Sequence, residues 1–536
     1  MSQEAQEYGF SRRQVTLGLV AIFAVYGTMA YFLQTLTVAR PKMAADLDGM
    51  SLYAWAVSIP SLFSAFVTLI FGKLSDIHGR RIMLLVSVIL LLVGTILSAI
   101  SPTFTFLIFA SVVVALGTGA MMPLVFSVVG DLFPPAQRGK WIGLLNIPVG
   151  FFALVGPTLG GWVTDNLNWR YLFWLSIPLL IVCLVTVPVG VPSIVNRGAK
   201  GKIDVLGCVL IAIASSATIL GLSFAGTHHW KSLEVLGLLS VSVIFWIAFF
   251  VAEARIKAPI LDPAMFRNRA FVTVAVATLL SFFGQMAILM YFPMFLQGVQ
   301  GISATVSGQI ITPYSVLMAF IGVPVGFLLT KSRRFKWMYI VGFGILTADM
   351  FGIIFFTSET PVVWSVIAAT LAGLGLGAVP TINTMVVQNA VPKRLLGVAM
   401  GAFFFFISMG VAVSPAVLGS AMTFGYNKTL SNALPKGLER IADEATMASL
   451  SDSDVLLSEP AMAALEDTFR KHGAQGEALL AETVQAIRSA MESGLRNVFW
   501  LSAITMLLAF LLISTVPESS MEEKVPEEIP EPVGAE

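Results

Sequence analysis

A short charged segment lies between two long apolar runs of this sequence, and its residues are the first that could do chemistry. It reads Gly72-Lys-Leu-Ser-Asp-Ile-His-Gly-Arg-Arg81, a G-x-L-x-D-x-x-G-R-R pattern with one carboxylate and a cluster of cations. A charge buried in lipid costs about 2.5–3.5 kcal/mol per residue on insertion scales. The segment must therefore lie at a membrane face, and its candidate functional residues are Gly72, Asp76, Gly79, Arg80 and Arg81.

Other reactive side chains are sparse. The four histidines lie outside the apolar runs and lack metal-ligand spacing, so we expect no metal site. The two cysteines, Cys183 and Cys208, lie inside apolar runs and are too few for a disulfide framework. The sequence has no Ser-His-Asp arrangement and no phosphate-binding G-x-x-x-x-G-K-[ST] motif. We therefore expect neither an enzyme nor an ATP-driven pump, and no cofactor.

The composition indicates an all-α membrane protein. Of 536 residues, 57% are hydrophobic and 12% are charged. A soluble protein of this composition would expose too much apolar surface, whereas each spanning helix needs about 20 apolar residues. The formal net charge of +1 gives no indication of a nucleic-acid partner.

Hydropathy predicts fourteen transmembrane helices. Residues 1–13 are polar, and the apolar run after them is too long for a signal peptide, so it is read as an uncleaved first span. The predicted spans are 14–38, 53–71, 82–100, 104–129, 141–163, 171–189, 205–225, 233–252, 271–292, 306–329, 337–356, 362–387, 398–422 and 498–516.

The lysines and arginines predict the orientation of these spans. With the N-terminus inside, 21 of the 32 fall in inside segments and 4 in short outside loops. The other 7 lie in the long segment 423–496, and long translocated segments escape the rule. Both termini are therefore expected in the cytoplasm, in a cell (inner or plasma) membrane. Segment 423–496 is predicted to be a helical cap on the outer face, and the tail 517–536, rich in Pro and Glu, to be disordered.

The two halves of the chain repeat each other. Leu116-Gly-Thr-Gly-Ala120 recurs 258 residues later as Leu374-Gly-Leu-Gly-Ala378, and Pro157 recurs as Pro415 at the same offset. Gly72 with Arg80 is matched more loosely by Gly326 with Arg334, at an offset of 254. Parallel repeats of this kind predict two pseudo-symmetric six-helix bundles, 14–189 and 271–516. Residues 205–252 have no repeat partner and are predicted to be two inserted helices.

Several motifs resemble those of the major facilitator superfamily, and in particular its fourteen-span drug:proton antiporter (multidrug exporter) family. The segment 72–81 is similar to the superfamily's signature loop between its second and third spans. Further similar pieces are Pro134-Pro-Ala-Gln-Arg-Gly139, Gly156-Pro-Thr-Leu-Gly-Gly161, Asn168-Trp-Arg-Tyr-Leu-Phe173, Ile203-Asp-Val-Leu-Gly207, Phe266-Arg-Asn-Arg-Ala-Phe271 and Tyr291-Phe-Pro-Met-Phe-Leu-Gln297.

The chemistry of the signature loop fits a gate between two moving bundles. Its two glycines allow a tight turn. Asp76 could cap a helix of the other half, while Arg80 could pair with Asp131 at the end of span four. The alternative is that the charges only anchor the loop in the cytosol. Span five contains five small residues that are expected on one helix face: Gly150, Gly156, Pro157, Gly160 and Gly161. The resemblance associates this element with export. Ordinary helix packing would need the same residues.

Proton coupling is less clear from the sequence. Members of the resembled family carry an acid in span one and an arginine in span four, where this chain has Phe32 and Val113. Asp349 is the acid that falls well inside a predicted span, and it is either a coupling residue or a structural polar contact.

The substrate cavity is expected between spans one, four, nine and twelve. Its uncharged aromatic, thioether and amide side chains suit bulky lipophilic molecules. The candidates are Tyr26, Tyr31, Gln34, Met121, Met122, Phe282, Gln285, Met286, Tyr291, Asn383 and Gln388.

The sequence thus predicts an exporter of hydrophobic or amphiphilic small molecules that works by alternating access, with proton antiport as the expected driving force. The expected partners are the substrate, membrane lipids and protons, and the protein is expected to be a monomer. One alternative is a transporter of lipids or lipid-linked molecules without the usual proton site. Another is a non-transporting receptor or scaffold on the same fold.

Overall fold

The structure is a computed structural model. It describes residues 12–516 apart from 50–51, 193–203, 226–229, 257–260, 262, 333, 393–394, 436–437, 439–446, 448–449, 451–455, 457–458 and 471–472. The predicted tail 517–536 and most of the predicted N-terminal segment 1–13 lie outside the described residues.

Every regular element in the described part of the chain is a helix, as the composition predicted. In chain order they are α2 Arg12–Asp46, α3 Tyr53–His78, α4 Arg80–Ala99, α5 Phe104–Leu132, α6 Pro135–Leu144, α7 Asn146–Asn166, α8 Arg170–Gly190, α9 Val205–Ala225, α10 Leu233–Glu253, α11 Pro263–Arg267, α12 Arg269–Met286, η2 Ala287–Tyr291, α13 Phe292–Met294, η3 Phe295–Val299, α14 Ala304–Phe320, α15 Gly322–Ser332, α16 Lys336–Ile353, α17 Val362–Ala390, α18 Leu396–Ala433, α20 Glu459–Arg470 and α21 Gly473–Ser514. The two elements labelled η are π-helical turns.

Within the described residues, thirteen segments are long and apolar enough to cross a membrane. They correspond to thirteen of the fourteen predicted spans. The remaining one, 337–356, is the 18-residue helix α16, which packs against α17 and α21. This helix carries the carboxyl of Asp349 in its interior, and a carboxyl inside a span needs cover from neighbouring helices.

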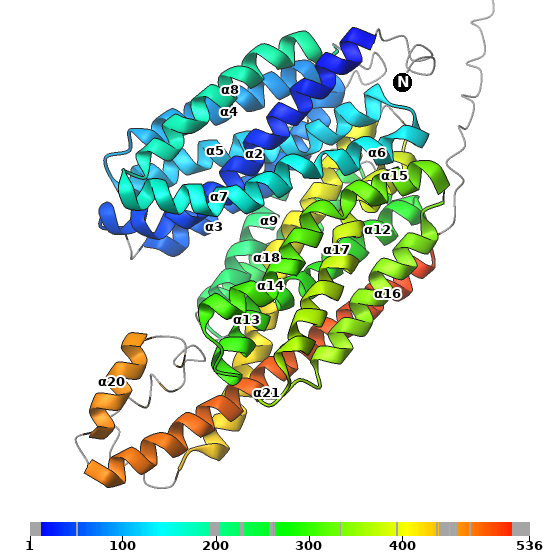
Figure 1. Ribbon diagram of the computed structural model, residues 1–536. Coiled ribbons are helices and arrows are strands. Elements are labelled where there is room, and N and C mark those ends of the chain that lie inside the picture. Colours follow the sequence, from blue (N-terminus) through cyan, green and yellow to red (C-terminus); the bar gives the residue numbers. More distant parts are fainter. Residues whose placement is uncertain are drawn as a thin grey trace, which may run out of the picture.

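The helices form two bundles, α2–α8 and α12–α21, which Figure 1 shows in blue to cyan and in green to red. The inserted pair, α9 and α10, packs against itself, and α9 also contacts α3 and α18. Aromatic contacts hold the pair there: Trp246 meets Phe405 with ring centroids 5.9 Å apart. The pair therefore lies beside the junction of the two bundles and contacts both of them.

Two of the predicted spans are broken helices. Span 141–163 is divided at Leu145 into α6 and α7, and span 306–329 is divided at Ile321 into α14 and α15. Each break lies three residues before a proline, Pro148 or Pro324. A proline lacks the N–H that would bond to the fourth residue back, so the backbone ladder is interrupted at these places. Each break creates a short helix at the bundle junction: α6 of the first bundle packs against α15 of the second.

Segment 423–496, predicted to be a helical cap, is helical over much of its described part and is continuous with two spanning helices. Helix α18 continues to Ala433 and α21 begins at Gly473, so both arms of the segment are extensions of spanning helices. Figure 1 shows α20 beside α21, away from both bundles. Leu465 and Phe469 of α20 are buried, and the Tyr426 hydroxyl donates to the Leu450 carbonyl at 2.8 Å. The prediction ended the first of these helices too early, at 422, and began the second too late, at 498, because polar turns carry no hydropathy signal.

Helix α7 packs on α2 through glycines. A Cβ on Gly156 would lie 3.0 Å from Thr35 Oγ1, and one on Gly160 would clash with the Thr35 carbonyl oxygen. Gly150 instead faces Phe320 of α14, and a Cβ on Gly161 would meet nothing within 4 Å. The expectation that all five small residues share one face was therefore wrong: the broken span contacts two different neighbours.

These two adjacent glycines allow a matched test of the packing. Gly160→Ala should destabilise the protein by about 1–3 kcal/mol, because overpacking forces α7 away from the α2 backbone. Gly161→Ala should be neutral or stabilising by up to about 1 kcal/mol, because alanine is the better helix former and its methyl group has room. Thermal unfolding of the purified variants measures both. Equal destabilisation by the two substitutions would contradict the α2–α7 contact.

Candidate functional site

A single glycine joins α3 to α4. α3 ends at His78, α4 begins at Arg80, and Gly79 between them has φ 93°. This left-handed conformation is open to glycine and strained for other residues. The tight turn predicted for the signature loop is present, and it returns the chain so that Asp76 and Arg80 face each other.

Gly72 lets α3 touch α18 of the other bundle. A Cβ on Gly72 would clash with the Gly397 carbonyl oxygen and lie 3.1 Å from the Gly401 Cα. A Cβ on Gly397 would clash with Arg80 and with the Gly72 carbonyl oxygen. The two backbones are therefore in direct contact, and neither glycine can gain a side chain without separating the bundles. We refer to residues 72–80 and Asp131, with the start of α18 at 397–401, as the α3–α18 contact.

Asp76 caps α18 from the opposite bundle. Its Oδ1 accepts from the Gly397 N–H at 3.1 Å, and its Oδ2 accepts from the Val398 N–H at 2.9 Å. These N–H groups belong to the first turn of α18, where a helix has no internal acceptors and its dipole favours negative charge. The cap that the sequence predicted is present.

Arg80 binds two carboxylates. Its Nη2 lies 2.6 Å from Asp76 Oδ1 and its Nε lies 3.0 Å from Asp131 Oδ2, which is the predicted ion pair; its Nη1 also donates to Ser75 Oγ. Asp76 and Arg80 are each only 3% exposed. Arg81 is partly exposed and does not belong to this cluster.

The α18 terminus completes the charge balance of this cluster. Two carboxylates face one guanidinium, so the three side chains alone carry one uncompensated negative charge. The partial positive charge at the start of α18 faces Asp76, one of these two carboxylates, and so offsets part of the excess negative charge. Since a buried charge that loses its partner is destabilised by about 3–5 kcal/mol, the cluster favours the arrangement in which α18 is docked.

A second glycine contact, between α6 and α15, repeats the first. Here a Cβ on Gly326 would clash with the Gly139 carbonyl oxygen, and one on Gly143 would lie 2.5 Å from the Gly322 carbonyl oxygen. Gly326 follows Gly72 by 254 residues, while Gly139 and Gly143 precede Gly397 and Gly401 by 258. The offsets predicted from the sequence therefore relate two real contacts between the bundles.

The carboxylates are not repeated with the glycines, although Arg334 follows Arg80 by the same 254 residues. The position equivalent to Asp76 is Thr330, whose hydroxyl donates to the Gly326 carbonyl at 3.0 Å. The position equivalent to Asp131 is Asn389, whose Oδ1 accepts from Arg138 Nη1 at 3.0 Å. Arg138 is 3% exposed and also donates to the Gly130 carbonyl oxygen at 2.8 Å. This arginine–amide bond joins the bundles.

Arg138 and Asn389 were missed by the sequence prediction. Two signals could have found them: Arg138 lies in the Pro134–Gly139 motif, and Asn389 follows Asp131 by the repeat offset. Gln388, predicted to line the cavity, also joins the bundles, because its Nε2 donates to the Phe126 carbonyl oxygen at 2.8 Å.

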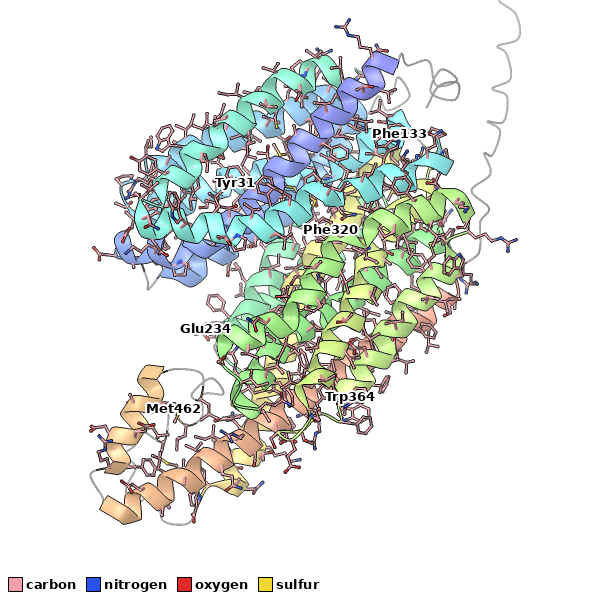
Figure 2. All side chains as sticks on the ribbon, in the orientation of Figure 1. Tyr31, Phe133, Glu234, Phe320, Trp364 and Met462 are labelled. Atoms are coloured by element: carbon pink, nitrogen blue, oxygen red, sulfur yellow. The ribbon has the colours of Figure 1, made fainter. Side chains whose placement is uncertain are left out.

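Several other cavity candidates are buried and contact residues of their own bundle. The Tyr31 hydroxyl donates to the Leu172 carbonyl at 2.6 Å, and Tyr31 is drawn inside the N-terminal bundle in Figure 2. Asn383 accepts from the Tyr339 hydroxyl at 2.6 Å and donates to Thr278 Oγ1 at 2.8 Å. Met121 is fully buried. In this conformation none of these three side chains faces a cavity, because a polar or bulky group between packed helices is held by its nearest partners.

The remaining candidates keep some exposure or lie near a junction. Tyr26 packs edge-on against Phe126, and the Tyr291 hydroxyl donates to the Pro415 carbonyl at 3.1 Å. Gln285 Nε2 lies 3.4 Å from Met318 Sδ. The partly exposed members of the set are Gln34, Met122, Phe282, Gln285 and Met286. Phe320, which the prediction did not include, lies between the bundles against Gly150 (Figure 2).

Asp349 lies apart from these contacts, on the α16 face that carries Gly342 and Leu346. Both of these residues meet Gly375 of α17. Asp349 is 6% exposed, and its Oδ2 has no hydrogen-bond partner among the described residues. No group of three or more potential metal ligands occurs in the described part of the chain.

The comparisons with known proteins agree with this architecture. The family model described as Major Facilitator Superfamily matches residues 19–415. The chain belongs to the major facilitator superfamily. It is therefore a membrane transporter and not an enzyme.

Relatives within the superfamily include two Bacillus subtilis (strain 168) proteins. The multidrug transporter protein MdtP is 28% identical over 87% of this chain and 86% of its own length. Multidrug resistance protein 3 is 28% identical over 89% of this chain and 90% of its own. The solved structure of the human organic anion transporter MFSD10 covers 94% of this chain and 99% of its own with a TM-score of 0.57; at 14% identity, it supports the fold alone.

The α3–α18 contact of this superfamily member predicts a measurable change of conformation. Asp76→Asn removes the charge that binds Arg80 and the α18 terminus, so the population with separated bundles should rise by about tenfold or more. Spin labels on the exposed residues Ile82 and Trp337 would report it as a longer distance between the bundles.

The matched control for this variant is Asp46→Asn. Asp46 forms a solvent-exposed pair with Lys42 at 3.6 Å, and exposed pairs of this kind contribute little. An unchanged distance distribution in Asp76→Asn, or an equal change in both variants, would contradict the role of the α3–α18 contact.

Proposed function

We propose that this protein exports hydrophobic or amphiphilic small molecules across the cell membrane by alternating access, with both termini in the cytoplasm. The observation that carries the proposal is the α3–α18 contact, a buried charge cluster whose members come from both bundles. The names of its relatives support a small-molecule substrate: one is a multidrug transporter, one a multidrug resistance protein, and a third, 33% identical over 49% of this chain, a lincomycin resistance protein.

The contacts between the bundles are suited to breaking and forming again. They include glycine backbones, one capped helix terminus, a few polar bonds such as those of Arg138 and Gln388, and the ring contact of Phe126 with Phe404. When they separate, the charged groups gain water in place of protein partners. The two states therefore differ by a modest free energy that a bound substrate can overcome.

The side chains proposed to meet substrate carry no fixed charge. Gln34 and Gln285 supply hydrogen bonds, while Met122, Phe282 and Met286 supply adaptable apolar surface. A site of this kind favours lipophilic molecules of varied shape over ions.

Asp349 is proposed as the coupling group for proton antiport. Phe32 is 5% exposed and packed edge-on against Tyr31, so the position of the usual span-one acid is occupied by an aromatic pair. Asp349 supplies a carboxyl inside a span whose Oδ2 lacks a partner among the described residues. A carboxyl that gains and loses a proton as its helix environment changes would couple efflux to the proton gradient.

The coupling proposal predicts that Asp349→Asn abolishes the dependence of efflux on an imposed pH gradient in everted vesicles while leaving dye binding intact. Dye fluorescence measures both quantities. Asp46→Asn is the control and should keep wild-type dependence, since its carboxyl is exposed to solvent at the end of α2. Equal gradient-dependent rates in wild type and Asp349→Asn would remove Asp349 from the mechanism without affecting the export proposal.

A second candidate, export of lipids or lipid-linked molecules, is favoured by the extensions of α18 and α21. They carry α20 and a small buried core away from the bundles, where a lipid could be received. Replacing residues 434–472 by a short Gly-Ser linker should then abolish delivery of a fluorescent lipid and spare efflux of a small dye. Loss of neither activity would exclude the lipid role. A non-transporting scaffold would instead show no flux that Asp76→Asn could reduce.

A further inference from the structure

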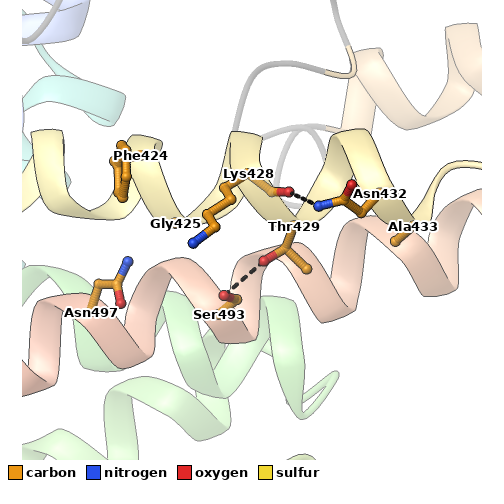
Figure 3. Close-up of a pocket in the computed structure, with 8 residues that line it drawn as sticks. All are labelled: Phe424, Gly425, Lys428, Thr429, Asn432, Ala433, Ser493 and Asn497. Atoms are coloured by element: carbon orange, nitrogen blue, oxygen red, sulfur yellow. Dashed lines mark hydrogen bonds between the residues drawn. The ribbon is translucent and has the colours of Figure 1, made fainter.

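A groove lies between α18 and α21 in the outer segment. The two helices touch where Gly425 faces Gly494, because a Cβ on Gly425 would lie 3.0 Å from the Gly494 Cα. Beside this point of closest approach is a hollow of about 480 Å³. Figure 3 shows the residues that line it: Phe424, Gly425, Lys428, Thr429, Asn432, Ala433, Ser493 and Asn497.

The groove carries one cation and several neutral hydrogen-bonding groups. Figure 3 shows the Lys428 side chain directed from α18 toward α21, between Asn497 and the Thr429–Ser493 pair. Thr429 Oγ1 and Ser493 Oγ lie 2.8 Å apart, so these two hydroxyls are already oriented by one another. An ammonium with adjacent amide and hydroxyl donors is a set that binds phosphate or carboxylate oxygens.

Lys428 forms no ion pair within the described part of the chain, whereas its neighbour Arg496 is paired with Glu492 at 2.8 Å. Among the described residues, therefore, no carboxylate is paired with the cation of the groove. One helical turn nearer the membrane, Phe424 is 69% exposed and forms an apolar edge of the same groove. An aromatic ring one turn below a lysine is the arrangement that proteins place at the boundary between acyl chains and headgroups.

We propose that this groove binds the phosphate headgroup of an anionic lipid in the outer leaflet. Lys428 binds the phosphate, Asn497 and Ser493 donate to its remaining oxygens, and the acyl chains lie along Phe424. The exposed phenyl ring favours a lipid over free phosphate, because one lysine in open solvent binds an inorganic ion weakly while the apolar contact adds affinity. A lipid bound here would hold the extensions of α18 and α21 at the membrane surface.

The test uses the purified full chain in detergent and counts bound lipid by native mass spectrometry. Phosphatidylglycerol should be retained in preference to phosphatidylcholine, and Lys428→Gln should weaken its retention about fivefold, the contribution of one interfacial lysine. Phe424→Ala should weaken retention of phosphatidylglycerol as well. Lys231→Gln, which removes another exposed lysine on the same predicted face, should retain lipid as wild type does.

Three results would overturn the proposal. The first is equal retention of phosphatidylglycerol by wild type and Lys428→Gln when both have the same unfolding temperature. The second is equal retention of the zwitterionic and anionic lipids by the wild type. The third is displacement of the lipid by millimolar inorganic phosphate together with no effect of Phe424→Ala, which would assign the groove to a free anion.

Discussion

The relation between the two bundles depends on one buried carboxylate. Asp76 of α3 binds Arg80 on its own bundle and the first backbone N–H groups of α18 on the other. While the bundles are in contact, its charge is stabilised by these two partners, and removal of either one would leave a buried charge without compensation. Gly72 and Gly397 make this binding possible, since a side chain at either position would hold the α18 N–H groups beyond hydrogen-bond range of Asp76.

The twofold repeat of the fold makes an asymmetry visible. Two glycine contacts join the bundles at equivalent positions, yet the carboxylates of the first are replaced in the second by Thr330 and Asn389. The repeated glycines follow from geometry, since both pairs of helices must approach closely. The unrepeated carboxylates give one contact its ion pairs and leave the other with hydrogen bonds from Thr330 and Arg138 to uncharged acceptors. The two contacts therefore differ in how strongly water and ionic conditions act on them.

The inserted helices and the extensions of α18 and α21 are additions to two six-helix bundles that contact each other directly through α3 and α18 and through α6 and α15. α9 covers the junction of α3 and α18, while the extensions of α18 and α21 leave the bundles altogether. α18 therefore contributes to three features of the molecule: its first turn is capped by Asp76, its middle contacts the inserted pair, and its last turns form one wall of the groove at Lys428. One continuous helix of 38 residues connects all three.

The sequence by itself determined the class of fold, the spans and the short-range chemistry. Apolar runs of spanning length, the repeat offsets and the spacing of Asp76, Arg80 and Gly79 predicted two bundles and a charged turn, because these features depend on neighbours along the chain or on lipid. Only the tertiary structure decided which side chains are already satisfied. Tyr31 and Asn383 looked like cavity residues, but each has a partner on another helix, and Arg138 found Asn389 across the bundles. The physical reason is that hydropathy reports the environment of a helix, whereas a hydrogen bond between helices depends on their rotation and depth, which the packing of all the spans sets together.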